Sequence, residues 1–326
     1  MKPVSLSVII VSWNAKAYLE ECLQSLAEDV YDGPMEIVVV DNASSDGSAD
    51  MVQRRFPAVT LIRNTANLGF SKANNIGIRR CTGDYIALVN SDVHVLKGCL
   101  SELVAFCESR ADVGVVGPKI IGRDGKRQVS YKGFPRLWNS LCRALALDVL
   151  LPRLALFNGY LQWHEAPDRV TPVDILSGCF LVAKRRAIDR VGLLDEGFFI
   201  YGEDMDWCKR FWHAGWQVVF VPFAEAIHYG GASSSNAPLR FSIEMQRADC
   251  QYWAKHHSRT ASSLYVLISY VHHAVRIAGH SIASMTNRRL SSDRMQKAKS
   301  SAACLRWMAV DRLRGTSGSS APLHGS

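Results

Sequence analysis

Short apolar runs rich in β-branched residues alternate with helical patterns, and this alternation restricts the possible folds more than any other feature of the sequence. Five runs are predicted as strands: Leu6–Ser12, Glu36–Asp41, Val59–Arg63, Tyr85–Asn90 and Val113–Pro118. Helices are predicted between them, over Ala17–Glu28, Ser48–Phe56, Ser71–Cys81 and Lys97–Ser109. Such a pattern is typical of an α/β protein with a mostly parallel sheet and helices on its faces.

Further elements are predicted towards the middle of the chain. They are a strand over Ile175–Ala183, helices over Lys184–Val191 and Asp204–Ala214, and a strand over Gln217–Val221. The segment Tyr131–Val173 before them is irregular, with many large apolar side chains and few charges. It fits either a core helix pair or a partly exposed, lipid-facing insert, and we favour the core.

The beginning of the chain argues against several enzyme classes. Lys2 and the apolar run that follows are similar to a secretory signal, but the run is short and leads directly into a strand–helix pattern. We therefore interpret it as the first buried strand. The turn after it, Ser12-Trp13-Asn14, lacks the glycines of a dinucleotide-binding loop, and no P-loop motif follows. A dehydrogenase, a P-loop phosphotransferase and a sugar nucleotidyltransferase are therefore disfavoured.

Charge and cysteine content restrict the partners and the compartment. The formal net charge is +8, and from Arg276 onward nine Lys/Arg face two Asp, a surplus of seven. The first 275 residues are thus close to neutral, and we do not expect nucleic acid as a partner. The nine cysteines form no C-x-x-C pair, which argues against a disulfide framework or a structural zinc site and favours a reducing cytosol.

Polar residues follow the predicted strands, where the ligand crevice of an open α/β sheet lies. Asp41 ends the second strand, and its carboxylate can accept a hydrogen bond from the imide N–H of uracil or thymine. A turn follows, with either Asp46 or Ser48 predicted as the N-cap of the next helix. Asn67, Gly69 and Asn74 belong to an asparagine-rich loop and helix. Alone these indicate a well-capped helix, but next to Asp41 the amides fit contacts with a ribose or a base.

A candidate metal site comprises two segments that lie far apart in the sequence. Asp92 follows the strand Tyr85–Asn90, where a carboxylate beside a pyrophosphate would suit a hard divalent cation. A lone aspartate at a strand end is often only a cap. His228 precedes a Gly/Ser loop, and it fits a structural histidine and a metal or phosphate ligand about equally well.

Three acids open the predicted helix that follows the aromatic segment Phe198–Tyr201. They are Glu203, Asp204 and Asp206. Acids at a helix start are favourable for the helix dipole, which gives them a purely structural explanation. A carboxylate beside an apolar wall is also desolvated enough to act as a base.

These segments, in this order, resemble the family 2 glycosyltransferases, and in particular their bacterial rhamnosyltransferase-like branch. The matching stretches span roughly residues 5–235: Val8–Asn14, Glu36–Ser48, Asn67–Gly77, Gly83–Val93, Ser177–Cys179, Gly192–Arg210 and His228–Ser233. The resemblance implies a GT-A fold, in which a Rossmann-like nucleotide-binding half merges with an acceptor-binding half. It also implies an inverting transfer from a nucleotide sugar.

The resemblance assigns roles to individual residues. It implies that Asp41 binds the base, Asp92 binds Mg²⁺ or Mn²⁺, Asp204 is the catalytic base and His228 is a late metal or pyrophosphate ligand. Glu203 is expected to bind the acceptor or support its loop, and Asp206 to cap or pair within the fold. Asn90 replaces the first acid of the D-x-D motif, which leaves a single carboxylate. The nucleotide-sugar site as a whole is expected to comprise Ser12, Asn14, Asp41, Asn42, Asn67, Gly69, Asn74, Ser91 and Asp92.

The expected donor is dTDP-L-rhamnose, and a UDP-hexose or UDP-hexosamine is the alternative. The expected acceptor is a saccharide or a polyprenyl-diphosphate-linked saccharide in bacterial surface polysaccharide synthesis. A catalytically inactive nucleotide-sugar-binding protein is the non-enzyme alternative. A glycosidase is disfavoured because it would not need Asp41 or the asparagine-rich helix.

The last part of the chain differs in character. Leu264, Ile268, Val271, Val275 and Ile282 fall on one helical face, while polar residues interrupt any run long enough for a membrane span. We predict a GT-A domain over 1–258, with a nucleotide-sugar-binding half at 1–120 and an acceptor-binding half at 121–258. A basic amphipathic helical extension at 259–315 is predicted to associate with an anionic membrane, and 316–326 to be a disordered tail. The expected location is therefore cytoplasmic, at the inner face of the cell membrane.

Overall fold

The computed structural model describes residues 4–29, 31–151, 154–158, 168–231, 237–286 and 291–310. These residues form two compact units. The first unit contains the described residues up to Gly133 and those from 168 to 231. The second contains the described residues of 134–158 and those from 237 to 310. This second unit begins before Ser258, and the predicted division into functional domains stays a prediction.

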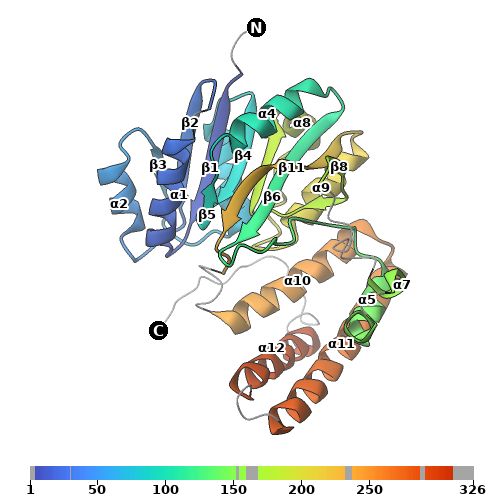
Figure 1. Ribbon diagram of the computed structural model, residues 1–326. Helices are drawn as coiled ribbons and strands as arrows, with labels where there is room; N and C mark the ends of the chain where they lie inside the picture. Colours follow the sequence, from blue (N-terminus) through green and yellow to red (C-terminus); the bar gives the residue numbers. More distant parts are fainter. Residues whose placement is uncertain are drawn as a thin grey trace. The chain divides into compact units, whose positions relative to one another are not determined.

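A mixed, mostly parallel sheet forms the first unit (Figure 1). Its main path has the order β3-β2-β1-β4-β10-β6-β11-β5, and β8 pairs with β11. The strands are β1 (Leu6–Ser12), β2 (Met35–Asp41), β3 (Thr60–Arg63), β4 (Tyr85–Asn90), β5 (Val93–Val95), β6 (Val113–Gly122), β8 (Thr171–Pro172), β10 (Phe180–Lys184) and β11 (Gln217–His228). Only β5, β8 and β10 run antiparallel to their partners, so the α/β class and the mostly parallel sheet are confirmed.

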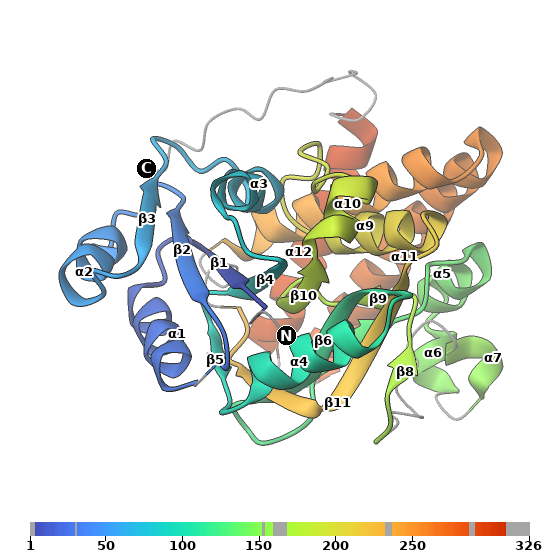
Figure 2. The ribbon, with the colours of Figure 1, turned by 90° about the horizontal axis from the view of Figure 1, so that it is seen from above.

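Helices cover both faces of this sheet (Figure 2). They are α1 (Lys16–Glu28), α2 (Ser48–Arg55), α3 (Phe70–Arg80), α4 (Cys99–Ser109), α8 (Arg185–Val191) and α9 (Glu203–His213). Leu6, Val8 and Ile10 of β1 belong to one core cluster with residues of α1 and α4. Ile9 points the other way, towards Gly77 of α3, where a Cβ atom would lie 2.5 Å from its side chain. Side chains of β1 thus alternate between the two faces of the sheet, and both faces are buried.

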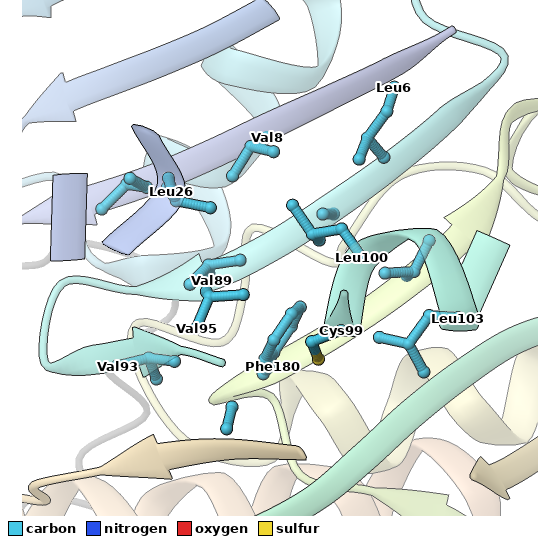
Figure 3. Packing of buried hydrophobic residues seen from close by; sticks show 14 of the residues in the cluster. Leu6, Val8, Leu26, Val89, Val93, Val95, Cys99, Leu100, Leu103 and Phe180 are labelled. Carbon is cyan, nitrogen blue, oxygen red and sulfur yellow. The ribbon is translucent and has the colours of Figure 1, made fainter. Parts of the chain in front are cut away.

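The core cluster is built mostly from buried aliphatic side chains (Figure 3). Phe180 of β10, Val89 of β4 and Leu103 of α4 pack together in it with Leu6 and Leu26. These elements lie far apart in the sequence, so their shared burial fixes the strand order.

Three predicted strands differ clearly from the observed ones. The strand expected over Val113–Pro118 continues to Gly122 as β6. The strand expected over Ile175–Ala183 is split, because Ile175–Leu176 forms β9, which pairs with β7 (Tyr131–Lys132) in a separate two-stranded sheet. Phe180–Lys184 then forms β10 in the main sheet. The strand expected over Gln217–Val221 continues to His228 past an irregularity between Val221 and Glu225. This extension carries His228 to a paired position beside Val93 of β5.

The second unit is helical. It contains α5 (Leu137–Ala144), α6 (Leu147–Leu150), α7 (Ala155–Asn158), α10 (Pro238–His256), α11 (Arg259–Thr286) and α12 (Ser291–Val310). α11 packs against both α5 and α12. Among the helices that the structure describes, none is both long and apolar enough to cross a bilayer. The predicted tail at 316–326 lies outside the described residues.

The core interpretation of the segment after Tyr131 is wrong for its central part. Val149 and Leu150 expose 72% and 70% of their surface, and Leu145, Leu151, Leu154 and Leu156 are also exposed. The sequence shows apolar residues here, but their exposure depends on distant elements: α11, which follows much later in the chain, packs against α5, while Val149 and Leu150 of α6 stay exposed.

Candidate functional site

The carboxyl ends of β1, β2 and β4 meet at one edge of the sheet. In the parallel register Ser12 lies opposite Asp41, and Val11 lies opposite Asn90. The polar residues predicted at the ends of separate strands are therefore neighbours. Ser12, Asp41 and Asn42 are all buried at this edge.

Asp41 has one carboxylate oxygen engaged and one available. Oδ2 accepts a hydrogen bond from the backbone N–H of Ser44 at 3.1 Å. Oδ1 is buried, and within the described part of the chain it has no hydrogen-bond partner. The hydroxyl oxygen of Ser12 is likewise buried and without a hydrogen-bond partner among the described residues. Leaving a buried polar atom unpaired costs free energy, and a ligand at this edge could pair with both atoms.

Asn14 joins the turns that follow β1 and β2. Its backbone has a positive φ of 50°. Its Oδ1 accepts a hydrogen bond from the Ser45 N–H at 2.8 Å, and its own N–H donates to the Ser44 hydroxyl at 3.0 Å. Asn14 therefore shapes the rim of the edge where Asp41 lies.

The predicted amides are directed largely at the protein itself. Asn42 Oδ1 accepts hydrogen bonds from Asn64 Nδ2 and from the N–H of Leu68, and Asn42 Nδ2 donates to Asn67 Oδ1. Asn74 Nδ2 donates to the carbonyl of Phe70. These bonds hold the loop between β3 and α3 against the end of β2. Their contacts with a nucleotide sugar stay predictions.

Gly69 lies where this loop packs closely against the segment before α9. Its φ is +83°, and a Cβ atom there would lie 2.4 Å from the carbonyl oxygen of Phe199. The next residue, Phe70, donates its N–H to the same oxygen at 2.6 Å. Only glycine fits both the backbone conformation and the close approach.

Asp92 and His228 are brought together by the pairing of β5 with β11. His228 Nε2 lies 3.3 Å from Asp92 Oδ1, and the N–H of Tyr229 donates to the Asp92 carbonyl at 3.0 Å. Ser91 and Asp92 are buried. Two positions earlier, the buried Asn90 Oδ1 has no partner among the residues that the structure describes.

These side chains fit a divalent cation only in part. An aspartate, an imidazole and an unpaired amide oxygen are suitable ligand types. Over the described ranges, however, no three His, Cys, Asp or Glu side chains form a metal-binding group. A cation held here would therefore take its remaining ligands from a bound diphosphate and from water.

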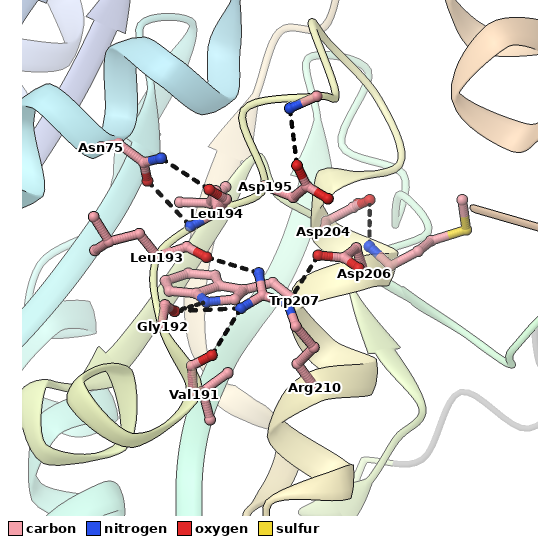
Figure 4. Close-up of polar contacts among 12 residues, drawn as sticks. Asn75, Val191, Gly192, Leu193, Leu194, Asp195, Asp204, Asp206, Trp207 and Arg210 are labelled. Atoms are coloured by element: carbon pink, nitrogen blue, oxygen red, sulfur yellow. Dashed lines mark hydrogen bonds and ion pairs between the residues drawn. The ribbon is translucent and has the colours of Figure 1, made fainter. Parts of the chain in front are cut away.

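The three acids of α9 have three different environments, and Figure 4 shows those of Asp204 and Asp206. Asp206 is fully buried and pairs with Arg210, whose Nε lies 2.9 Å from Asp206 Oδ2. Arg210 also donates to the carbonyls of Val191 and Leu193. Asp206 thus supports the loop before α9, which confirms its predicted role of pairing within the fold.

Asp204 faces the turn that separates β9 from β10. Its Oδ2 accepts a hydrogen bond from the N–H of Gly178 at 3.2 Å, and its Oδ1 accepts one from Met205 at 2.8 Å. A Cβ at Gly178 would lie 3.4 Å from the Cβ of Asp204. The carboxylate is therefore oriented by backbone donors.

Glu203 lies beside Asp204 but is desolvated. Burial, followed by the negative charge of Asp204, raises the pKa of Glu203 from 4.5 to about 8, against the opposing effect of Lys132. Its Oε2 finds no hydrogen-bond partner in the described chain. Glu203 is therefore mostly protonated at neutral pH and can donate a hydrogen bond.

Gln128 contacts the site but was not predicted from the sequence. Its Nε2 donates to the carbonyl of His228 at 2.8 Å, and its Oε1 lies 3.0 Å from His228 Nδ1. Asp124-Gly125 is a turn signal that could have indicated a hairpin returning along β6. Nothing local shows that the hairpin meets His228.

Comparisons with known proteins agree with this geometry. The model of "Glycosyl transferase family 2" matches residues 7–161, and that of "Glycosyl transferase family group 2" matches residues 85–256. The N-acetylglucosaminyl-diphospho-decaprenol L-rhamnosyltransferase of Mycobacterium tuberculosis is 30% identical over 78% of this chain and 85% of its own. The chain belongs to glycosyltransferase family 2. It is a glycosyltransferase of the rhamnosyltransferase-like kind, as the sequence predicted.

Other relatives support the family and the fold. Rhamnosyltransferase WbbL of Escherichia coli is 27% identical over 68% of this glycosyltransferase and 82% of its own chain. The mannosyltransferase PcManGT of Pyrobaculum calidifontis, solved with GDP-Man and Mn²⁺, has a TM-score of 0.58 at 19% identity, covering 97% and 89% of the two chains. Staphylococcus aureus TarS 1-349, solved with UDP, has a TM-score of 0.50 at 16% identity, covering 95% and 92%. The fold is therefore GT-A-like.

Replacement of Glu203 by glutamine is expected to stabilise the protein in a pH-dependent way. The folded-state pKa of about 8 lies above the ordinary 4.5, so between these values the folded state retains a proton that the unfolded state loses. Wild-type stability then falls by about 1.4 kcal/mol per pH unit from this group alone. Glu203→Gln removes that loss, and its stability advantage should grow from pH 5 to 8.

Thermal or urea unfolding of both proteins across this pH range measures the difference. Glu28→Gln, at an exposed position of α1, makes the same chemical change away from the site and is the matched control. A pH-independent difference for Glu203→Gln would contradict the raised pKa.

Proposed function

We propose that this glycosyltransferase transfers L-rhamnose from dTDP-rhamnose, with inversion, to a saccharide or polyprenyl-diphosphate-linked acceptor in bacterial surface polysaccharide synthesis. The observation that carries the nucleotide part is the buried, unpaired Oδ1 of Asp41 at the carboxyl edge of the sheet. An imide N–H of thymine or uracil would complete its hydrogen bonding. The rhamnosyl part is supported by the names of the two rhamnosyltransferase relatives.

The metal part of the proposal rests on Asp92 and His228. These residues would hold Mg²⁺ or Mn²⁺ beside the diphosphate of the donor, with Ser91 adjoining. When bound, such a cation stabilises the negative charge that develops on the departing diphosphate. Asn90 contributes a neutral oxygen where the D-x-D pattern has an acid.

The acceptor hydroxyl would lose its proton to Asp204. The oxygen of the acceptor then forms a bond to the anomeric carbon while the bond from that carbon to the diphosphate oxygen breaks. This single displacement inverts the anomeric configuration. The neighbouring acids are less suited to this role. Glu203 is mostly protonated at neutral pH, and Asp206 is neutralised by Arg210. Glu203 would instead donate a hydrogen bond to the acceptor or to its loop.

A thermal-shift screen tests the donor. Full-length protein would be melted with dTDP-rhamnose, UDP-glucose, UDP-N-acetylglucosamine and GDP-mannose, each with Mn²⁺, with Mg²⁺ and with neither. A true donor at about 100 times its Kd should stabilise the fold by about 2.7 kcal/mol. We expect dTDP-rhamnose to give the largest shift. Stabilisation by a UDP sugar without any by the dTDP sugar would favour the UDP-hexose or UDP-hexosamine alternative.

Asp204→Asn tests the catalytic base. Loss of a general base should reduce turnover by roughly 10² to 10⁴ while donor binding is retained, because the amide keeps the shape of the side chain. Turnover and donor affinity would be measured together, with Glu203→Gln and Asp206→Asn as comparison variants. Near-normal turnover in Asp204→Asn, with a folded but inactive Glu203→Gln, would show that the base is misassigned. Absence of turnover in the wild type with every bound donor would favour the inactive binding protein.

The proposed partner of the second unit is an anionic membrane surface. On α11 the buried positions Tyr265, Ser269 and His273 include two polar residues, while Leu267 and Ile282 expose 61% and 64% of their surface. The helix therefore directs apolar side chains outward, as α6 does with Val149 and Leu150. Exposed apolar surface of this kind marks a protein or membrane contact.

Positive charge favours the membrane over an apolar protein partner. Arg143 of α5 lies close enough to Arg276 of α11 to lower its pKa, with burial as the larger cause. Arg294, Lys297 and Lys299 of α12 add to this charge. Basic residues near an anionic leaflet contribute about 1 kcal/mol each. Arg288, Arg289, Arg312 and Arg314 of the same basic segment lie outside the described residues.

Vesicle flotation of the full-length protein tests this partner. The double variant Leu267→Asp/Ile282→Asp should bind vesicles containing phosphatidylglycerol at least roughly tenfold more weakly, since each buried side chain contributes about 1.5 to 3 kcal/mol. Phe223→Asp replaces an exposed apolar side chain of the first unit and serves as the control. Equal flotation of double variant and wild type, or equal binding to uncharged vesicles, would contradict the proposal.

A further inference from the structure

Gln128 reaches His228 because of the hairpin at the end of β6. In the parallel pairing of β6 with β11, Gly122 lies opposite His228. The chain then turns back, with Gly122 N–H donating to the Lys126 carbonyl at 2.7 Å and Gln128 N–H donating to the Ile120 carbonyl at 2.8 Å. A Cβ at Gly122 would lie only 3.1 Å from Gln128 Nε2. The absence of a side chain at position 122 thus leaves room for that of Gln128.

Two contacts fix the orientation of the Gln128 amide. The backbone carbonyl of His228 can only accept, so the atom facing it at 2.8 Å must be the amide nitrogen. The amide oxygen is then the atom that faces His228 Nδ1 at 3.0 Å. Because this oxygen can only accept, Nδ1 must carry a proton.

The other ring nitrogen faces a second acceptor. In a neutral ring with the proton on Nδ1, Nε2 presents a lone pair, and it lies 3.3 Å from Asp92 Oδ1. Two lone pairs at this distance repel unless a positive species, either a proton or a metal cation, lies between them. A divalent cation bound by both atoms would meet this need, and a ligand histidine commonly donates its second N–H to a neighbouring acceptor.

We propose that Gln128 is a positioning residue that holds His228 in the tautomer whose Nε2 can bind a divalent cation together with Asp92. The inference rests on the proposed function, because it presumes the cation site at Asp92 and His228. It adds to that site a residue that touches neither the cation nor the substrate. Gln128 acts through two hydrogen bonds: it accepts one from Nδ1 of His228 and donates one to the backbone carbonyl of His228.

The first experiment measures the tautomer in the wild-type protein without metal. Nitrogen NMR of protein labelled at histidine, at pH 8, distinguishes a ring nitrogen that carries a proton from one that does not, and His228→Gln identifies the signal. We expect a proton on Nδ1 and none on Nε2. A proton on Nε2 alone, or on both nitrogens, would overturn the proposal. In Gln128→Lys, whose ammonium group only donates, the proton should move to Nε2.

The second experiment measures Mn²⁺ affinity in the presence of dTDP, by the electron paramagnetic resonance of free Mn²⁺. Gln128→Met keeps the length of the side chain, removes both hydrogen bonds and adds no charge. Its Mn²⁺ affinity should fall about 10- to 100-fold, while dTDP binding without Mn²⁺ stays unchanged. Gln53→Met makes the same chemical change at an exposed position of α2 and should have no effect.

Asp92→Ala and His228→Ala separate the two levels of the argument. If both lose the Mn²⁺ response and Gln128→Met retains wild-type affinity, the role of Gln128 is wrong and the proposed metal site stands. If neither alters the response, the metal site itself is misassigned. Melting curves show whether Gln128→Met folds. If it does not fold, the tautomer measured in the wild-type protein tests the role of Gln128.

Discussion

The parallel register of β1, β2 and β4 is the constraint on which the candidate site depends. It aligns Ser12 with Asp41 and Val11 with Asn90, so that polar side chains from three separated segments end at one edge. Apolar burial on both faces sets this register, since a shift of one residue would turn every core side chain of β1 to the opposite face. The hydrophobic core therefore determines where the polar chemistry is placed.

The candidate site contains polar atoms that lack a partner within the described chain. Asp41 Oδ1, Asn90 Oδ1 and Glu203 Oε2 are buried, and none has a partner among the residues described by the structure. Each such atom costs about 1 to 3 kcal/mol in the free protein. By contrast, the side chain of Asn42 donates to Asn67 Oδ1 and accepts from Asn64 and Leu68, which holds the loop before α3. The unpaired atoms thus separate the groups available to a ligand from those that build the walls.

Much of the first unit could be predicted because its signals are local. The bounds of β1 and β4 follow from the ends of their apolar runs and agree with the structure. What could not be predicted depends on contacts across the sequence. The extension of β11 to His228 requires pairing with β5 and β6, and Gln128 meets His228 only through that pairing. The exposure of Val149 and Leu150 likewise depends on helices encoded much later in the chain.

The acids of α9 show that residues of the same chemical type can have different environments in the folded protein. Glu203, Asp204 and Asp206 look equivalent in the sequence, where each can favour a helix start. Their differences come from distant partners: Arg210 neutralises Asp206, while Gly178 donates its N–H to Asp204. Burial, with the charge of Asp204 next, keeps Glu203 protonated. Adjacent acids that look alike in the sequence therefore occupy environments that differ in burial, charge and hydrogen-bond partners.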